Sequence, residues 1–572
     1  MAPSRRSILL WSSLSGVLWA LAWPAVGGFT ALAFVAWLPL LHAERLHEER
    51  TVERKRAFVP NVLLAVFIWN AATSWWFFAV SEPLGTRLVS GFTPMIVNSL
   101  LMIIPWWLKR VVRRFVDPKA ASYGFVFFWL AFEHLHHDWD LQWPWFSIGN
   151  VFGTTPSWIQ WYEYTGMLGG SLWVLVVNLL LDGVAFNWTI RRPGSIAFLF
   201  GALMLVLLPW ASSAWLFNST DTHGGPSVEV VVVQPCIDPY TEKFGGMDPL
   251  RQLDEMLALA EPLMTDSTAL VVLPETALQE GATLDMYGVE PVYHGLWEND
   301  LANARSTRRL EEFQDRFPTA ALLTGMSADK LFSREENVPV SARPLFPPGH
   351  VPPSGQRWYE AYNAALFLPS EGPLEHYNKS KLVAGVELMP FERILGPLGD
   401  LALDLGGTSG SLGQQEEREV LRDSRSGLRI APAICYESVF GEHVAAHIRN
   451  GANVIAIITN DGWWAKTPGY KQHLTFASIR AIETRREVVR SANTGISCFV
   501  DRKGVIRDAT DWWVPTAERG TVQLYDELTF YVLHGDQIGR VAMACSTLLL
   551  LLTMVRMVQR RKEPRPTRAE RR

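Results

Sequence analysis

The stretch 428-LRIAPAICYE-437 decides the fold of the larger part of this chain. Its apolar, β-branched run has the length of a buried strand, and it ends abruptly in Cys435, Tyr436 and Glu437. An ionisable side chain directly after a buried strand is costly unless it has a partner or a chemical task. The stretch therefore predicts a buried sheet whose edge carries chemistry.

The same pattern repeats on both sides of this stretch. Short apolar runs predict strands at 228–235, 268–276, 321–327, 363–369, 428–437, 453–461 and 495–501. Amphipathic patterns between them predict helices at 248–265, 301–316, 441–450 and 470–492. Alternating strands and helices indicate an α/β domain over residues 226–531. Two stretches, 338–356 and 396–415, are long loops, and we expect the second to touch a membrane.

The chain before this domain is different, because it consists mostly of long apolar runs. A helix that crosses a bilayer needs about 20 mostly apolar residues. Seven runs before the α/β domain and one after it meet this requirement approximately: 7–25, 27–43, 58–80, 91–108, 120–137, 168–188, 195–217 and 539–558. The first two are expected to form a tight helical hairpin, and the first could instead be a signal peptide. The predicted organisation is a membrane domain over 1–217, the α/β domain, a closing helix at 539–558 and a basic tail at 559–572.

The basic residues set the predicted orientation of these segments. Lys and Arg gather at the amino terminus, in 44–57, in 109–119, at Arg191 and Arg192 and in the tail, whereas the alternate loops are nearly bare. Cytoplasmic loops carry such an excess of positive charge. We therefore expect both termini in the cytoplasm and the α/β domain on the other side of the membrane.

One outer loop, 138–168, is rich in Trp around the sequence WPWFSIGN. Its rings fit an aromatic belt at the headgroup level, and a surface that guides lipid to a site above the membrane is the alternative. Just before it, Glu133, His134, His136, His137 and Asp138 resemble a metal-binding run. No other stretch completes a ligand set, so no metal is expected.

Three ionisable residues at strand ends form a chemical set. Glu275 closes the run ALVVLPE, Lys379 lies in HYNKSKLV, and Cys435 ends APAIC. A partly desolvated Glu can take the proton of a Cys thiol, and a Lys ammonium can stabilise the oxyanion of a tetrahedral intermediate. Together these residues are suited to acyl transfer through a thioester.

Three motifs, PET (274–276), YNK (377–379) and CYE (435–437), resemble those of the carbon–nitrogen hydrolase (nitrilase) superfamily. With seven membrane segments before the α/β domain and one after it, the chain is similar to the membrane-embedded apolipoprotein N-acyltransferase family. The likeness covers essentially the whole chain, including WPWFSIGN, VVVQPCID, TNDGWW and 471-KQHLTFASIRAIETRREVVRSANTGIS-497. It implies a multi-pass α-helical membrane domain joined to an α-β-β-α sandwich, in the inner membrane of a bacterium with the sandwich in the periplasm.

The resemblance also implies roles for individual residues. Glu275 is then the general base, Lys379 the oxyanion-stabilising residue and Cys435 the nucleophile. Glu387, Tyr436, Glu437 and Asn363 are implied as supporting residues, and Phe244, Trp463 and Trp464 as substrate-binding residues. The chain departs from the family pattern His-Leu-Val-Pro-Phe-Gly-Glu, since residues 381–387 read KLVAGVE. This departure leaves the three central residues in place and alters the lid beside them.

The implied activity moves an acyl chain from a phospholipid to the α-amino group of a diacylglyceryl-cysteine at the start of a lipoprotein. The expected partners are the phospholipid donor, the diacylglyceryl-apolipoprotein acceptor and the bilayer, with a monomeric enzyme and no cofactor. Two alternatives stay open: a membrane-tethered amidase or nitrilase that uses water as acceptor, and a non-catalytic lipid-binding or transport protein.

The composition of the chain excludes several other classes of protein. With 48% apolar residues among 572, the chain is not disordered. Its four cysteines contain no CxxC pair and indicate neither a disulfide framework nor a zinc site. The net charge of −5 without a long basic face argues against nucleic acid as the main partner.

Overall fold

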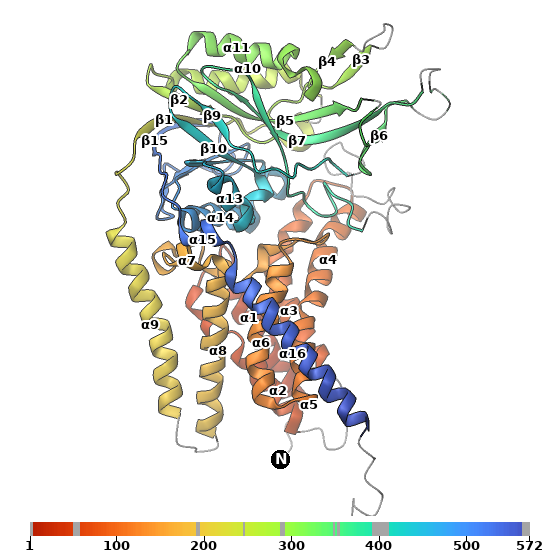
Figure 1. The fold of residues 1–572 in the computed structure, drawn as a ribbon, viewed down its shortest axis with the longest axis vertical. Helices are drawn as coiled ribbons and strands as arrows, with labels where there is room; N and C mark the ends of the chain where they lie inside the picture. Colours follow the sequence, from red (N-terminus) through yellow and green to blue (C-terminus); the bar gives the residue numbers. More distant parts are fainter. Residues whose placement is uncertain are drawn as a thin grey trace, which may run out of the picture.

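The computed structural model describes residues 4–49, 58–189, 195–243, 246–285, 292–333, 335–346, 349, 351, 355–391 and 411–562. Figure 1 shows a bundle of long helices at one end of the molecule and a layered α/β domain at the other. The expected loop 396–415 lies outside the described residues except at 411–415, and 338–356 is described only in part.

The helical end is built from the N-terminal part of the chain and the closing helix. Its long helices are α1 (Arg5–Ala22), α2 (Leu38–Glu49), α3 (Val59–Ser74), α4 (Leu84–Leu101), α5 (Ile103–Phe115), α6 (Pro118–Leu135), α8 (Met167–Thr189), α9 (Ser195–Ser219) and α16 (Gln537–Lys562). Within the described ranges, five helical segments are long and apolar enough to cross a bilayer: Val59–Ala79, Leu84–Phe115, Met167–Ala185, Ile196–Ser219 and Gln537–Arg561. The chain is therefore a membrane protein.

One expected membrane segment is wrong. Residues 27–43 do not form one helix but the short 3-10 turn η1 (Thr30–Phe34) followed by α2. Pro39 is consistent with a new helix starting here, because proline lacks an N–H and is best tolerated in the first turn of a helix. It stands at the second residue of α2. The runs 7–25 and 120–137 do form helices, α1 and α6, of 18 residues each.

Several Trp residues of this end are packed together in its core. Trp37 is 1% exposed, and its ring lies 5.0–6.1 Å from those of Trp19, Trp69, Trp106 and Trp129. The loop 138–168 is also packed inward, as three short 3-10 turns, η3 (Pro144–Phe146), η4 (Ile148–Phe152) and η5 (Pro156–Trp158), and the short helix α7 (Tyr162–Thr165). Within this loop Trp145 is buried and Trp139 is 36% exposed, and the headgroup belt expected there stays a prediction.

Two sheets form the centre of the α/β domain. Sheet I has the strand order β15 (Thr516–Gln523), β1 (Ser227–Gln234), β2 (Thr268–Val272), β5 (Ala321–Leu331), β7 (Trp358–Leu368) and β6 (Arg343–Pro344), with β8 (Glu375–Asn378) also paired to β7. Sheet II has the order β14 (Ile506–Arg507), β13 (Cys498–Val500), β12 (Val488–Ala492), β11 (Val454–Thr459), β10 (Leu428–Ile434) and β9 (Leu421–Asp423). A small separate hairpin joins β3 (Thr283–Asp285) to β4 (Val292–His294).

Helices cover the outer face of each sheet. Successive strand residues point to opposite faces, so Val230 and Val232 pack with sheet II while Val231 and Val233 pack on the other side. Sheet I is covered there by α10 (Pro249–Ala260) and α11 (Arg305–Arg316), and sheet II by α13 (Gly441–Arg449) and α14 (Pro468–Thr484). The predicted α-β-β-α sandwich is confirmed. Figure 1 places α13 and α14, together with α15 (Phe530–His534), on the side of the sandwich that faces the membrane helices.

One helix boundary differs from the prediction. The helix expected over 470–492 ends at Thr484, because Arg485 adopts the left-handed conformation at φ 50°. The β-branched pair Val488 and Val489 then begins β12, which runs parallel to β11. Because the amphipathic pattern continues past Arg485, the sequence did not reveal where α14 ends and β12 begins.

Candidate active site

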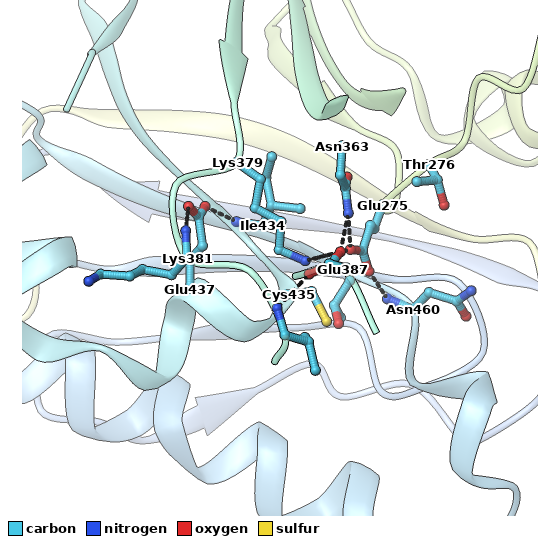
Figure 2. Close-up of polar contacts among 12 residues, drawn as sticks. Glu275, Thr276, Asn363, Lys379, Lys381, Glu387, Ile434, Cys435, Glu437 and Asn460 are labelled. Carbon is cyan, nitrogen blue, oxygen red and sulfur yellow. Dashed lines mark hydrogen bonds and ion pairs between the residues drawn. The ribbon is translucent and has the colours of Figure 1, made fainter. Parts of the chain in front are cut away.

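Three strand ends meet between the two sheets and bring Glu275, Lys379 and Cys435 together. Glu275 lies three residues after β2, Lys379 directly follows β8, and Cys435 directly follows β10. Figure 2 shows the three side chains converging, with Asn363, Glu387 and Asn460 around them. Ligand sites in α/β sheets are commonly found at such carboxyl ends of strands.

Glu275 is held as a buried carboxylate, with 5% of the residue exposed. Its Oε1 accepts from Asn363 Nδ2 at 2.8 Å and from Lys379 Nζ at 3.3 Å. Its Oε2 accepts from the backbone N–H of Asn460 at 3.0 Å. Both oxygens are therefore fixed, and the carboxylate cannot rotate freely.

Lys379 connects two carboxylates. Its ammonium, in a side chain that is 1% exposed, lies 2.8 Å from Glu387 Oε1 as well as 3.3 Å from Glu275 Oε1. Burial alone disfavours a charged lysine, but Glu387 and Glu275 outweigh it and hold the pKa of Lys379 above its usual value. Lys379 is therefore a fixed positive charge.

Glu387 is placed by a tight turn within the stretch 381–387. Gly385 adopts φ 82° and donates its N–H to Leu388 O at 2.7 Å. This left-handed conformation suits a glycine. Glu387 Oε2 accepts from Val383 N–H at 2.9 Å, while its Oε1 is also 3.0 Å from Asn363 Nδ2. The stretch 381–387 thus delivers a glutamate to the lysine.

Cys435 begins the 3-10 turn η10 (Cys435–Val439) in a strained conformation, at φ 51°. Its carbonyl oxygen accepts from Ser438 Oγ at 2.7 Å, and His473 Nε2 lies 3.1 Å from the same oxygen. Burial and the carboxylate of Glu275 raise the pKa of the thiol well above its usual value, against the opposing effect of Lys379. The resting thiol is therefore protonated near neutral pH.

The other predicted neighbours of Cys435 join it to the rest of the molecule. Glu437 Oε1 accepts from the N–H of Ser380 at 2.6 Å, and its Oε2 accepts from the N–H of Ile434 at 2.8 Å. Burial opposes its charge, but His443 and these backbone donors lower the pKa of Glu437 to about 2. This residue ties the lysine loop to the cysteine turn. The hydroxyl of Tyr436 donates to the carbonyl of Gln142 in the loop above the membrane helices, at 2.9 Å.

Trp463 and Trp464 lie in the turn after β11, and Trp464 contacts the membrane end. The ring of Trp464 lies 4.7 Å from that of Trp76, and the ring of Trp463 lies 5.3 Å from that of Tyr240. Phe244, the third predicted substrate-binding residue, lies outside the described residues.

A cavity of about 620 Å³ reaches Glu275, Lys379 and Cys435. On one side it is walled by membrane-helix residues, which include Trp76, Phe77, Val89, Thr93, Val97 and Leu101. On the other side it reaches polar residues of the α/β domain, which include Gln279, Glu280, Ser327, Asp329 and Arg343. Trp143 and Trp145 of the outer loop line it too, so this loop contributes to the site.

Two groups in this region were not predicted. The buried ammonium of Lys243 donates to the carbonyl of Glu275 at 2.8 Å and to Thr276 Oγ1. Burial lowers the pKa of Lys243 to about 7, although Glu275 and Cys435 act in the opposite direction. The second group consists of Asp461, which lies inside the motif TNDGWW (459–464), and His473, which lies inside 471-KQHLTFASIR-480. A carboxylate at the end of the predicted buried strand 453–461 was the signal that could have found it.

The acidic and histidine run before the outer loop is held by protein contacts. Glu133 Oε1 accepts from the N–H of Ile148 at 2.7 Å and from the indole of Trp129 at 2.8 Å. His136 Nδ1 accepts from the indole of Trp139 at 3.0 Å.

Comparisons with known proteins agree with this arrangement. Residues 15–180 match the family model described as the apolipoprotein N-acyltransferase N-terminal domain, and residues 230–524 match that of carbon-nitrogen hydrolase. A protein of Chlorobaculum tepidum named apolipoprotein N-acyltransferase is 29% identical over 554 residues, which is 95% of this chain and 96% of the relative. A protein of Geobacter metallireducens with the same name is 27% identical over 565 residues, with coverages of 97% and 96%.

Solved structures include an amidase from Nesterenkonia sp., which is 16% identical. It covers 56% of this chain and 97% of its own, with a TM-score of 0.32. The fold assignment rests on the matched family model and the observed sheets rather than on this similarity.

Proposed function

We propose that this chain, which belongs to the carbon–nitrogen hydrolase family, is a membrane-bound acyltransferase. It moves an acyl chain from a phospholipid to the α-amino group of the S-diacylglyceryl-cysteine at the start of an apolipoprotein. The names of its relatives and the matched N-terminal family model support this substrate class.

The observation that carries the proposal is the cavity shared by the two ends of the molecule. Val89, Thr93 and Val97 recur every four residues on α4, so they lie on one face of that helix. This face lines the same cavity as Cys435. An acyl chain held along α4 would place its carboxyl carbon near the thiol. A small soluble amide would be too short to contact this apolar face of the helix.

In the first half-reaction, Glu275 takes the thiol proton as Cys435 sulfur attacks the ester carbonyl of the phospholipid. Lys379 stabilises the oxyanion that forms. The tetrahedral intermediate then breaks its carbon–oxygen bond. Glu275 returns its proton to the departing alkoxide, which leaves as a lysophospholipid. The acyl group remains on Cys435 as a thioester.

In the second half-reaction, the amine of the acceptor attacks the thioester carbonyl. Glu275 takes the proton that the nitrogen loses, the carbon–sulfur bond breaks, and the thiolate of Cys435 recovers the proton. The products are an amide on the acceptor and free enzyme. Because donor and acceptor use one pocket in turn, the kinetics are ping-pong.

The remaining residues support these steps. Asn363 and Glu387 orient the base and the lysine, and Glu437 holds the lysine loop against the cysteine turn. Trp463 and Trp464 form part of the wall against which the acyl chain packs. No step calls for a metal or a nucleotide, and all these groups come from one chain, which fits a monomer.

The function is tested with a labelled phospholipid and a synthetic diacylglyceryl-cysteine peptide, using the purified full chain in vesicles. We expect label on the amino group of the peptide and none when Cys435 is replaced by Ala. Release of free fatty acid as the sole product, with no peptide labelled, would instead identify an amidase-like hydrolase.

We further propose that both termini lie in the cytoplasm of a bacterium and that the α/β domain lies in the periplasm. The Lys and Arg asymmetry supports this orientation. An enzyme reporter active only outside the cytoplasm should work when fused near residue 300 and fail when fused after residue 565. Activity at both positions, or at neither, contradicts the orientation.

A further inference from the structure

A buried histidine that the proposed mechanism does not use lies directly behind the nucleophile. His473, on α14, is 2% exposed and lines the cavity. Its Nδ1 lies 2.8 Å from Asp461 Oδ1, and its Nε2 lies 3.1 Å from the carbonyl oxygen of Cys435. The ring therefore bridges the turn after β11 and the turn after β10.

The bridge continues to a third strand of sheet II. Asp461 is fully buried, and its Oδ2 accepts from the guanidinium of Arg490, on β12, at 2.7 Å. Arg490 is itself 1% exposed. An unbroken chain of contacts thus runs from Arg490 through Asp461 and His473 to the backbone of Cys435.

The hydrogen bonds define how the ring is used. Ser438 donates its hydroxyl proton to the Cys435 carbonyl, so its oxygen is available to accept from His473 Nε2 at 3.1 Å. The ring nitrogens thus contact Asp461 on one side and Cys435 and Ser438 on the other, and a guanidinium nitrogen of Arg490 lies 3.4 Å from Nδ1. Asp461 therefore holds both the imidazole of His473 and the guanidinium of Arg490.

Cys435 needs such support because of its backbone. A non-glycine residue in the left-handed region is strained and persists only where its surroundings impose it. At φ 51°, Cys435 is in that region. Its carbonyl is the atom that both Ser438 and His473 contact.

The same turn also holds the base. The N–H of Asn460 donates to Glu275 Oε2 at 3.0 Å, and the next residue, Asp461, binds His473. Two consecutive residues therefore fix Glu275 on one side and, through the histidine, Cys435 on the other. We propose that Arg490, Asp461 and His473 form a positioning chain that sets the nucleophile against the base. This inference rests on the proposed role of Cys435 and Glu275.

The test uses p-nitrophenyl butyrate, a small ester that needs no lipid-binding wall. Attack by Cys435 forms a carbon–sulfur bond and breaks the ester carbon–oxygen bond, while Glu275 takes the thiol proton and p-nitrophenolate leaves. The burst of p-nitrophenolate therefore reports acylation of Cys435. The variants are His473→Leu, His473→Gln, and His473→Gln combined with Asp461→Asn, each as full-length protein.

A glutamine at 473 can donate to the Cys435 carbonyl only if its own oxygen faces position 461. Aspartate there repels that oxygen, whereas asparagine can donate to it. We expect His473→Leu and His473→Gln to slow the maximal burst rate by about 100-fold, the effect of a misplacement near 1 Å. The double variant should recover at least about tenfold of this loss, because it restores the hydrogen-bond chain. The ester concentration at half-maximal rate should change by less than about twofold.

Ile482→Ala is the control, since Ile482 is equally buried nine residues further along α14 and makes no polar contact with the site. It should lower the melting temperature and leave the burst rate of the folded protein unchanged. A wild-type burst rate in folded His473→Leu, or a double variant no faster than His473→Gln, overturns the positioning chain. If the wild-type chain bursts with the ester but accepts no acyl group from phospholipid, the proposed donor is wrong, and the variant series still tests the positioning chain.

Discussion

Sheet I and sheet II hold their reactive groups in different ways. Sheet I supplies Glu275 and Lys379 as side chains that bind each other, with Glu387 and Asn363 completing a compact cluster of charge. Sheet II supplies Cys435 through a strained backbone, which contacts behind it hold in place. The charged groups of sheet I thus supply the base and the oxyanion-stabilising ammonium, and the backbone of sheet II sets the position of Cys435. Loss of a sheet I group should remove a chemical step, whereas loss of a supporting group in sheet II should weaken alignment.

The largest effect is expected for Glu275→Gln. It removes the base, so formation of the acyl-enzyme from phospholipid should fall by about 100- to 10,000-fold. The same substitution should make the resting thiol of Cys435 easier to deprotonate, although it slows acyl-enzyme formation. Burial and then Glu275 raise the pKa of Cys435, so removal of this carboxylate lowers the pKa and leaves more thiolate near neutral pH.

Iodoacetamide alkylation of Cys435, followed by mass spectrometry across a pH series, measures this second effect. In the wild-type chain, alkylation should be slow near neutral pH and still be rising above the usual thiol range. In Glu275→Gln the profile should shift to lower pH. If alkylation and acyl transfer decline together, Glu275 is a structural residue rather than a base.

The next effect is expected for Lys379→Met, compared with Lys381→Met. The first substitution removes the oxyanion donor, so acyl-enzyme formation should fall by about 100- to 1,000-fold. It also leaves the buried Glu275 and the partly buried Glu387 without their cation, which should lower the free energy of unfolding by about 3–5 kcal/mol.

Lys381 is the matched control, two residues further on. Its ammonium binds Asp138 Oδ1 at 3.1 Å, and the Asp138 side chain is 93% exposed, so the pair contributes about 1 kcal/mol or less. Lys381→Met should keep most of its activity. Gel assays of labelled acyl-enzyme and thermal melts distinguish the two variants, and an inactive Lys381→Met beside an active Lys379→Met would reverse the assignment.

The smallest effect concerns the wall rather than either sheet. Val97→Trp fills the cavity along α4, so long acyl chains should lose room while short ones keep it. Exclusion of two methylene groups costs about 1.6 kcal/mol, or a little over tenfold in relative kcat/KM. The neighbouring residue Ile96 is 45% exposed and does not line the cavity, so Ile96→Trp should leave chain-length preference unchanged. Equal preference in all three proteins would show that the acyl chain lies elsewhere.

The three central residues were the more predictable part of the site. Glu275 and Cys435 each stand at the end of an apolar strand, where an ionisable residue is conspicuous, and Lys379 was found from its motif YNK. Alternating strands and helices predicted the α/β domain, and the family resemblance implied its sandwich form. Lys243 was missed because it binds the backbone carbonyl of Glu275. A contact to a backbone atom leaves no pattern in the sequence. His473 was missed because a histidine inside an amphipathic helix has the pattern of a core residue.

Boundaries that depend on one residue's backbone were the least predictable. Arg485 ends α14 in the left-handed region without a glycine or proline to mark the place. At the membrane end, Pro39 was visible in the sequence. The segment 27–43 was still predicted as one helix because its apolar run had a suitable length. The two errors share a cause, because periodicity and hydropathy describe averages over many residues and a helix ends at a single one.

The central claim is that Cys435 carries the acyl group between donor and acceptor. Its most direct test is intact-protein mass spectrometry after incubation of the purified chain with a phospholipid of defined acyl chains. The account predicts a mass gain of one acyl group that hydroxylamine removes, that persists when Cys236, Cys498 and Cys545 are all replaced by Ala, and that is absent in Cys435→Ala. An acyl adduct of the same mass in Cys435→Ala would contradict the account.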